Sequence, residues 1–548
     1  MPIKHPHLQL ERIPGAVPAW RGTIAAADLQ PICLGVCDSG GRLLALWGSD
    51  ERAQGRGCDT LPAEPADCGS SRVEPPPAPE GSAPPCRGRG YALHVVLVNE
   101  TGLVCLSVAL PAEQPGYPDI SHIFPSANRM QRAVYDLLGI YAHEGQDHRK
   151  WLRHAAWHSG SFPLRKDFDA AASLTHDADD YPFVQVEGQG VHEIPVGPVH
   201  AGIIEPGHFR FSIVGEKVLR LEERLGYTHK GIEKRFESLS LQQGARLAGR
   251  VSGDSTVAYA WAYAMAAESI ANVTPPDRAL WLRALLLERE RVANHLGDLG
   301  YLGNDVALSF GFAQFWILKE QLLRNNAALF GHRYLMDSII PGGVAVDLST
   351  EGMQLIEQEC AMLEQQVSIL RGIYEEHSGV QDRFIGAGRV EPKLAAQLGL
   401  CGLAGRASTQ AWDARVQFPC APYDKLDVQM ATHRNGDVAA RVIVRFDELF
   451  ESLRLQRLIL VNLLGDELLR PLEKLPAHGF GIGMVEGWRG EVMLALHTDA
   501  QGNLTRVHPH DPSWQNWPVL EHAVMNNIVP DFPLINKSFN LSYSGVDL

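Results

Sequence analysis

Beyond residue 183, apolar residues recur every three or four positions along most of the chain, the spacing that gives a helix one buried face. Proline and glycine at Pro341–Gly343 and at Pro471 interrupt this pattern. The spacing predicts helices over the following stretches: Ile232–Glu268, Asp277–Leu299, Phe312–Phe330, Gly352–Glu376 and Phe446–Leu469. We therefore expect a mainly helical C-terminal part.

The N-terminal third has shorter apolar runs separated by glycine and proline, a pattern typical of strands and turns. Tyr91–Val98 and Gly102–Leu110 flank a turn at Asn99–Gly102 and predict a hairpin. The remaining predicted elements are strands at Ile32–Val36 and Leu43–Trp47, a helix near Asn128–Leu138, and a β piece over Gly481–Val507. The predicted fold class is α+β: an N-terminal α/β domain, then a mainly α-helical domain with small β elements.

Two segments of biased composition divide the chain. Residues 48–90 are rich in proline and glycine, which predicts a flexible insertion. Residues 169–181 are small and acidic, which predicts a linker at 171–182. We expect one domain over residues 1–170 and a second over residues 183–548.

Charge and hydropathy narrow the function classes. The net charge of −15 argues against nucleic acid as a partner, because nucleic acid requires a basic surface. The longest apolar runs, Val257–Ala267 and Gly311–Leu318, are shorter than the ~18–20 residues that cross a membrane. The N-terminus lacks the apolar core of a signal peptide. We expect a cytoplasmic protein without a direct membrane span.

Cysteine and histidine spacing gives no strong metal motif. Cys33 and Cys37 are the one close pair among nine cysteines, and their spacing favours unpaired thiols in a reducing compartment. His154 and His158 are four residues apart, as a metal-binding pair on a helix would be. No carboxylate or cysteine at close spacing completes a ligand set, which favours solvated or interface histidines.

Polar residues gather in two places in the C-terminal part. The Gly/Pro-rich loop within Val196–Phe211 carries His200, Glu205 and His208, and Gly231 precedes a predicted long helix. Within 277–299, Glu288, Arg291 and His295 follow one helical face at i, i+3 and i+7. Polar residues in line on an apolar helix indicate a proton path or a buried network.

The N-terminal motifs resemble the C subunit of NADH:quinone oxidoreductase (complex I). Arg132–Tyr141, Asp147–Arg153 and Phe162–Phe168 follow one another in that family's order. The resemblance implies a docking and assembly domain without a cofactor of its own.

The C-terminal motifs are similar to hydrogenase-type large subunits and to the D subunit of complex I. The motifs are Val196–Phe211, Arg224–Lys234, Val485–Glu491 and Pro512–Trp517, with Trp488 where the family has proline. A domain like the complex I C subunit followed by one like the D subunit is the order of formate hydrogenlyase and hydrogenase-4 large subunits. The implied fold is that of a hydrogenase large subunit over residues 183–548.

The resemblance includes a loss at its metal site. In membrane-bound nickel–iron hydrogenases two Cys-x-x-Cys pairs hold the metals, and here those positions are Ser252, Ser255, Ser542 and Gly545. A serine hydroxyl stays protonated at neutral pH and is a poor ligand for a soft metal centre, unlike a thiolate. We therefore expect no metal and no hydrogen turnover.

The D subunit of complex I also lacks these cysteines, and it binds quinone in the emptied cavity. His200 matches the histidine that holds the quinone headgroup there, whereas the family's tyrosine falls at Gly253; Tyr259, two helical turns further on, is not its simple substitute. The residues expected to shape the cavity and move protons are His200, Glu205, His208, Asp254 and His295. Those expected to line the former metal cavity, as a possible quinone site, are Ser252, Ser255, Arg489 and Ser542.

Several of these residues also have a structural interpretation. Ser252, Asp254 and Ser255 are good helix N-caps. His200 and His208 could hydrogen-bond their own loop, and Arg489 could be a salt-bridge partner. The run Tyr259–Tyr263 is typical of helix packing.

The first functional hypothesis is a component of a complex I-like, energy-converting oxidoreductase at the inner face of the plasma membrane. Electrons would come from an iron–sulfur small subunit resembling the B subunit of complex I, and antiporter-like membrane subunits would move ions. This chain would hold no cofactor apart from quinone. NADH, if used, would bind another subunit, because no Gly-x-Gly-x-x-Gly follows a strand. The alternatives are a non-catalytic scaffold or coupling subunit, and a hydrogenase with replacement ligands.

Overall fold

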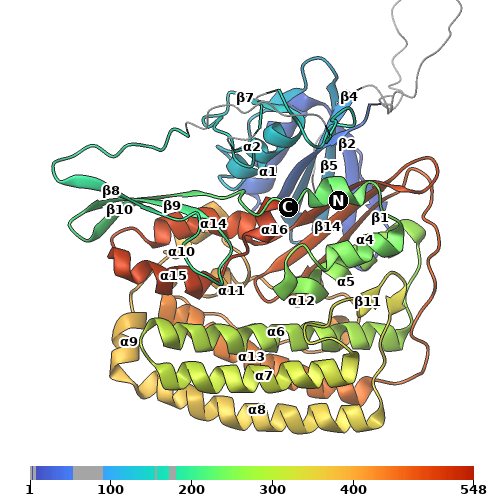
Figure 1. Ribbon diagram of the computed structural model, residues 1–548. Coiled ribbons are helices and arrows are strands. Elements are labelled where there is room, and N and C mark those ends of the chain that lie inside the picture. Colours follow the sequence, from blue (N-terminus) through green and yellow to red (C-terminus); the bar gives the residue numbers. More distant parts are fainter. Residues whose placement is uncertain (1–2, 4–7, 53–89, 155–156, 159, 172–180) are drawn as a thin grey trace, which may run out of the picture.

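The structure is a computed structural model that describes residues 3, 8–52, 90–154, 157–158, 160–171 and 181–548. The predicted insertion at 48–90 and the predicted linker at 171–182 fall mostly outside these residues. Within them, Figure 1 shows a β-rich N-terminal part above a stack of long helices. The predicted α+β class is confirmed.

The N-terminal part is a five-stranded sheet in the order β1-β2-β5-β4-β3, in which β2 and β5 are parallel and the other pairs antiparallel. Its strands are β1 (Glu11–Ile13), β2 (Ala19–Ile24), β3 (Arg42–Asp50), β4 (Gly90–Asn99) and β5 (Gly102–Pro111). Its helices are α1 (Leu29–Asp38) and α2 (Ala127–Leu138), and the part also contains a small parallel pair, β6 (Gly116–Pro118) and β7 (Tyr141–His143). The β4–β5 hairpin confirms the predicted one.

The strand predicted at Ile32–Val36 is wrong, because this run lies inside α1. Leu29, Ile32, Cys33 and Val36 are buried together there. Their separations of three, one and three residues place them on one helical face. A five-residue apolar run is too short for its periodicity to separate a strand from a buried helix.

The C-terminal part begins with a three-stranded antiparallel sheet, β10-β9-β8, which extends to one side of the molecule in Figure 1. Its strands are β8 (Val191–Val196), β9 (His208–Val214) and β10 (Lys217–Arg224). The next elements are α3 (Ile232–Phe236), α4 (Leu241–Ala248), the 3-10 turn η2 (Gly253–Ser255) and α5 (Thr256–Ala271). One long helix predicted over Ile232–Glu268 is therefore wrong, since Ser240 forms a capping box with Gln243 and begins a new helix.

Four long helices form the lower layer of the molecule, where they lie side by side in Figure 1. They are α6 (Asp277–Asp305), α7 (Ser309–Phe330), α8 (Thr350–Glu376) and α13 (Val438–Asn462). Helix α13 begins before the predicted Phe446 and ends before the predicted Leu469. Gly465, just beyond it, has a left-handed φ of +79° that cannot continue a helix. In the described ranges, no helix is long and apolar enough to cross a membrane.

A second antiparallel sheet, β13-β14-β15, packs against α5. Its strands are β13 (Phe480–Glu486), β14 (Glu491–Thr498) and β15 (Leu504–His510). The remaining elements are β11 (Ile339–Ile340), β12 (Gly343–Val344), α9 (Ser378–Phe384), α10 (Pro392–Leu398), α11 (Gly402–Arg406), α12 (Ala414–Gln417), α14 (Ser513–Ala523), α15 (Phe532–Phe539) and α16 (Ser544–Asp547).

Buried polar contacts join the two sheets across the domain junction. Arg42 of β3 donates to both carboxylate oxygens of Glu491 on β14, each at 2.5 Å. Arg506 of β15 donates to the Gly48 carbonyl at 2.9 Å. The N-terminal sheet is thus held directly against the sheet that backs α5.

Candidate functional site

The two stretches that carry the serines meet in space although they lie far apart in the chain. Ser252 Oγ and Ser542 Oγ are 2.9 Å apart, across 290 residues of sequence. Ser252 and Ser255 come from the turn before α5, while Ser542 and Gly545 come from the turn around the start of α16. The Gly545 N–H donates to Ser542 Oγ at 2.9 Å. Three hydroxyls and one glycine therefore stand where the resembling hydrogenases gather four thiolates.

An ion pair lies beside these hydroxyls. Arg489 donates to both carboxylate oxygens of Asp254, one of them at 2.9 Å, and its Nε donates to the Asn540 carbonyl. Burial alone would raise the pKa of Asp254, but the positive charge of Arg489 outweighs it and brings the pKa to about 2. Ser252 Oγ also donates to Asp254, at 2.8 Å. Asp254 is therefore a carboxylate at any physiological pH.

Trp488 fills the space beside this ion pair. Its side chain is 1% exposed, its indole N–H donates to the Asp254 carbonyl at 2.9 Å, and the Arg489 guanidinium lies 4.0 Å from its ring centroid. A proline at this position, as in the resembling family, would leave much of that volume open. The space around Ser252, Ser255, Ser542 and Gly545, hereafter the chamber, is thus filled in part by Trp488.

The Asp511 side chain lies directly against Gly545. A Cβ atom at position 545 would lie 2.7 Å from both Cγ and Oδ2 of Asp511, closer than non-bonded carbon atoms approach. Tyr259 donates to Asp511 Oδ2 at 2.7 Å, and the Ser513 N–H donates to Oδ1 at 2.8 Å. Asp511 thus occupies the place that a side chain at 545 would need.

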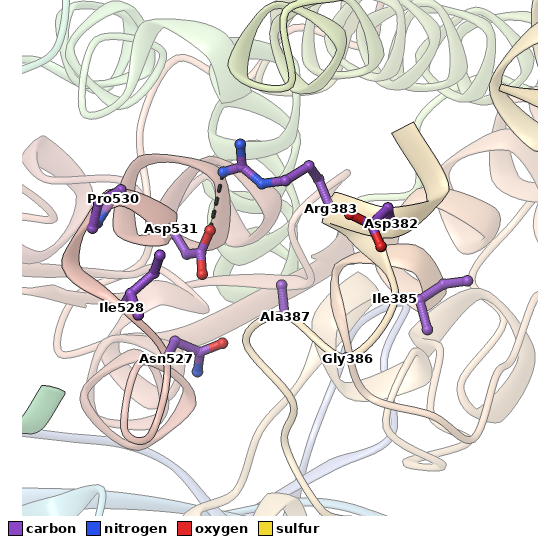
Figure 2. A pocket seen from close by; sticks show the side chains of 9 residues that line it. All are labelled: Asp382, Arg383, Ile385, Gly386, Ala387, Asn527, Ile528, Pro530 and Asp531. Carbon is purple, nitrogen blue, oxygen red and sulfur yellow. Dashed lines mark hydrogen bonds and ion pairs between the residues drawn. The ribbon is translucent and has the colours of Figure 1, made fainter. Parts of the chain in front are cut away.

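An open cleft of about 430 Å³ lies elsewhere on the surface. Figure 2 shows its walls, the end of α9 and the segment before α15, bridged by an ion pair from Arg383 to Asp531 at 3.0 Å. None of the predicted site residues lines this cleft.

The Gly/Pro-rich loop between β8 and β9 brings His200 and Glu205 toward the C-terminal segment. His200 Nε2 and the Tyr543 hydroxyl are 3.5 Å apart, and Glu205 accepts the Ser544 N–H at 3.1 Å. The loop closes tightly at Gly197, where φ is +86° and a Cβ would lie 2.2 Å from the Gly207 carbonyl oxygen. Burial lowers the pKa of His200, which favours the neutral ring.

His208 is separate from this group. It begins β9, its Nδ1 lies 3.4 Å from the Gly197 carbonyl, and its ring packs near Phe183. Within the described part of the chain its buried Nε2 has no hydrogen-bond partner. Burial lowers its pKa. The contact between a histidine and its own loop, expected as a structural role, is therefore present for His208.

His295 lies behind Trp488 on the inner face of α6. The two rings meet edge to face at 6.4 Å, and His295 Nε2 lies 3.0 Å from Glu448 Oε2. Burial lowers the pKa of His295 despite that carboxylate. Glu288 and Arg291 are buried on the same helix and paired at 3.2 Å, so the predicted polar face of this helix is confirmed.

The predicted N-caps of α5 are wrong. None of Ser252, Asp254 and Ser255 makes a side-chain capping bond in the described structure, and the Asp254 carboxylate pairs with Arg489 instead. Glu290 of α6 caps α5 instead, accepting the Val257 N–H at 2.7 Å and the Ala258 N–H at 3.2 Å. Burial raises the pKa of Glu290 to about 8. No local pattern could reveal this cap, since it comes from the next helix.

The contacts of the aromatic run in α5 and of His154 show the structural roles of these residues. The run Tyr259–Tyr263 is buried along α5, as helix packing predicts. His154 Nε2 bonds the Leu225 carbonyl at 2.8 Å and so joins the two domains. Among the described residues, no group of three or more His, Cys, Asp or Glu side chains is placed to hold a metal ion. Sequence reasoning missed Tyr543 and Asp511, although each lies next to a residue that it singled out.

The C-terminal segment that carries Ser542 and Tyr543 also contains a buried carboxyl group, that of Asp547. Asp547 accepts hydrogen bonds from Gly226 N at 2.8 Å, Thr228 N at 2.9 Å and Thr228 Oγ1 at 2.6 Å. Burial raises its pKa from 3.8 to about 6 despite these bonds. The folded protein therefore holds this proton more tightly than the unfolded chain does.

We expect this carboxyl to make folding stability fall as pH rises from about 4 to about 6, and to have no further effect above that window. The measurement is the Tm of the wild type minus that of Asp547→Asn, followed from pH 4 to pH 7. The difference should decline through the window, because the wild type alone must bury a charge there. A flat difference curve would contradict the raised pKa.

Family models match both parts of the chain. The model for the 30-kDa subunit of respiratory-chain NADH dehydrogenase matches residues 86–173, and that for the 49-kDa subunit matches residues 305–478. The membrane-bound sulfane sulfur reductase, an archaeal respiratory membrane complex, contains a chain of the same fold, with a TM-score of 0.62 and 24% identity over 66% of this chain and 99% of that one.

Curated relatives match over most of their length. Formate hydrogenlyase subunit 5 of Escherichia coli is 30% identical over 83% of this chain and 82% of its own. Hydrogenase-4 component G of the same organism is 30% identical over 83% of this chain and 81% of its own. The C/D subunit of the NADH-quinone oxidoreductase of Phocaeicola vulgatus is 28% identical over 75% of this chain and 83% of its own. The chain thus belongs to the family of fused 30-kDa and 49-kDa subunits that includes formate hydrogenlyase subunit 5 and hydrogenase-4 component G.

Proposed function

We propose that this chain is the acceptor-reducing subunit of a membrane-associated, complex I-like oxidoreductase, which transfers electrons to a quinone, couples this to ion translocation and has no hydrogenase activity. One observation carries the proposal: the ring of His200 and the hydroxyl of Tyr543 lie 3.5 Å apart, and the neighbouring Ser542 meets Ser252 at 2.9 Å, where the resemblance implies metal ligands. Oxygen donors of this kind do not suit a nickel–iron centre, which needs thiolates.

The pair suits a quinone headgroup because of what reduction requires. A quinone that takes up two electrons also takes up two protons, one at each carbonyl oxygen. Tyr543 presents an O–H donor whose pKa burial raises well above its ordinary value, and His200 presents a ring nitrogen. Both groups can hydrogen-bond a carbonyl and pass on a proton. Tyr543 would thus take the part of the family tyrosine that is missing at Gly253.

Buried polar residues offer a route for protons away from the chamber. Asn540, whose carbonyl accepts from Arg489, donates to Asp298 at 2.7 Å, and Arg445 donates to the other oxygen of Asp298 at 3.2 Å. One turn along the same two helices, His295 meets Glu448 at 3.0 Å. Buried polar groups in contact of this kind suit electrostatic coupling, and the histidine and carboxyl groups among them can carry protons.

The route continues to a carboxyl that titrates near neutrality. Arg406 contacts Glu448 at 2.7 Å and Glu486 at 2.7 Å. Burial, with Asp413 close by, raises the pKa of Glu486 to about 7. Glu486 would therefore be the group on this route that takes up and releases a proton.

The partners follow from the same proposal. This chain would receive electrons from the iron–sulfur cluster of a small subunit and would contact antiporter-like membrane subunits at the inner face of the plasma membrane. The relatives named above include a subunit of a formate hydrogenlyase and a subunit of an NADH-quinone oxidoreductase, which supports a role within a complex. NADH, if it is the donor, would bind another subunit.

A second candidate is a non-catalytic coupling subunit. Trp488 fills the chamber, and the hydroxyls of Ser252 and Ser542 already bond each other. In that case the polar route would transmit conformational or charge changes, and acceptor chemistry would occur elsewhere in the complex.

The test is quinone reduction by the complex isolated from host membranes. We expect His200→Ala and Tyr543→Phe each to lower kcat by about 10²-fold, the range for losing one acid–base group, while the composition of the complex stays unchanged. His192→Ala is the matched control, since His192 lies exposed on the same hairpin. Unchanged turnover in both site variants would favour the coupling role, and nickel in the sample would contradict the proposal.

A further inference from the structure

A small cavity lies where the two domains meet, away from the chamber. Its walls come from α2 and β3 of the N-terminal domain, from β15 and α14 of the C-terminal domain, and from Leu548. Its volume is about 20 Å³. One water molecule requires roughly 10–15 Å³ measured in this way, so the cavity accommodates a single water and no larger ligand.

Three side chains that line this cavity carry a buried polar atom without a partner in the described structure. They are Trp47 of β3, His508 of β15 and Trp514 of α14, and the atoms are the two indole N–H groups and His508 Nε2. All three residues are at least nine-tenths buried. An unpaired buried donor or acceptor is costly, so three of them on residues that line one cavity point to a shared partner.

The protonation state of His508 determines whether the shared partner must donate or accept a hydrogen bond at Nε2. His508 Nδ1 lies 2.8 Å from Glu233 Oε1, and Arg506 pairs with the same carboxylate at 2.7 Å. Burial would raise the pKa of Glu233, but Arg506 and His508 bring it to about 2, so Glu233 is an acceptor. Nδ1 therefore carries the proton of the neutral ring, because burial lowers the pKa of His508. Nε2 is left as an acceptor.

We propose that this cavity is a binding site for one structural water, which accepts hydrogen bonds from the indoles of Trp47 and Trp514 and donates one to His508 Nε2. Two donors and one acceptor match a water molecule, which commonly makes about three hydrogen bonds when buried. The stacking of Trp47 on His508, with ring centroids 4.7 Å apart, already aligns two of the partners. The water would hold β3 of one domain to β15 and α14 of the other.

The test compares the Tm values of variants of the full chain. If the indole N–H groups donate to a shared water, Trp47→Phe and Trp514→Phe should each lower Tm by about 1–3 °C more than a control that loses the same volume. The double variant should lose less than the sum, because both residues bond one molecule. Trp151→Phe is that control: its indole N–H is equally buried and unpartnered in the described structure, and it does not line the cavity.

A crystal structure of the wild type supplies the second measurement. Density for one water within hydrogen-bonding distance of all three nitrogen atoms would support the site. Absent density would overturn the proposal, as would Trp47→Phe and Trp514→Phe variants that are as stable as Trp151→Phe. If the indoles had no partner, their removal would relieve a cost that partly offsets the lost packing, as it does in Trp151→Phe, and the three variants would be equally stable.

Discussion

An Arg406→Leu variant is expected to lose about 3–5 kcal/mol of folding free energy, the usual cost of removing one partner from a buried ion pair. Arg406 is fully buried and pairs with both Glu448 and Glu486 at 2.7 Å. Its removal leaves two carboxyl groups in the protein interior without their shared counter-ion. We expect Glu486 to respond by staying protonated, which would also stop it releasing a proton at neutral pH.

Thermal unfolding of the isolated chain, or of the whole complex if the chain does not fold alone, measures the first effect. Arg324→Leu is the matched control, because Arg324 pairs with Glu320 on the surface, where its side chain is 75% exposed. Such surface pairs contribute about 0–1 kcal/mol. Equal stability of the two variants would mean that the buried ion pairs of Arg406 contribute no more to folding than a surface ion pair does.

Local patterns in the sequence predicted the elements whose signal is local. The hairpin around Asn99–Gly102 and the polar face of α6 both depend on residues close together in the chain, and the structure contains both. The run Ile32–Val36 failed because five apolar residues fit a strand and a buried helix equally well. The break at Ser240 was missed because helical spacing continues on both sides of it.

The site was less accessible to sequence reasoning because its contacts are long-range. The absence of cysteine at the four positions is visible in the sequence, but its consequences depend on residues brought together by folding. Tyr543 reaches His200 across 343 residues, and Asp511 takes the space beside Gly545. Neither residue has a local pattern that marks its role, so tertiary packing alone reveals them.

Restoring the four cysteines is expected to leave the protein without nickel. The quadruple variant Ser252→Cys/Ser255→Cys/Ser542→Cys/Gly545→Cys supplies the thiols, yet three features of the fold oppose a metal centre. Trp488 fills the chamber, Arg489 and Asp254 form an ion pair inside it, and Asp511 occupies the position of a side chain at 545. Metal analysis of the purified variant, expressed with hydrogenase maturation factors, should give the wild-type nickel background.

The single substitution at position 545 tests one of these three features by itself. A Cβ there would meet Asp511 atoms at 2.7 Å, and Tyr259 and Ser513 hold that carboxylate in place. Gly545→Cys alone should therefore cost about 1–3 kcal/mol, as overpacking of a core does. Gly372→Cys is the matched control, because nothing lies within 4 Å of a Cβ at 372.

A double-mutant cycle separates steric conflict from other causes. If Asp511 is the obstacle, Asp511→Ala should cost less in the Gly545→Cys background than in the wild type, because removing the carboxylate relieves the clash. Additive costs, or a Gly545→Cys variant as stable as Gly372→Cys, would contradict the filled site. Nickel in the quadruple variant would mean that the thiols alone were lost. The expected outcome would mean instead that Trp488 and Asp511 exclude a metal centre even when four thiols are present, so that a nickel site would also require replacement of these two side chains.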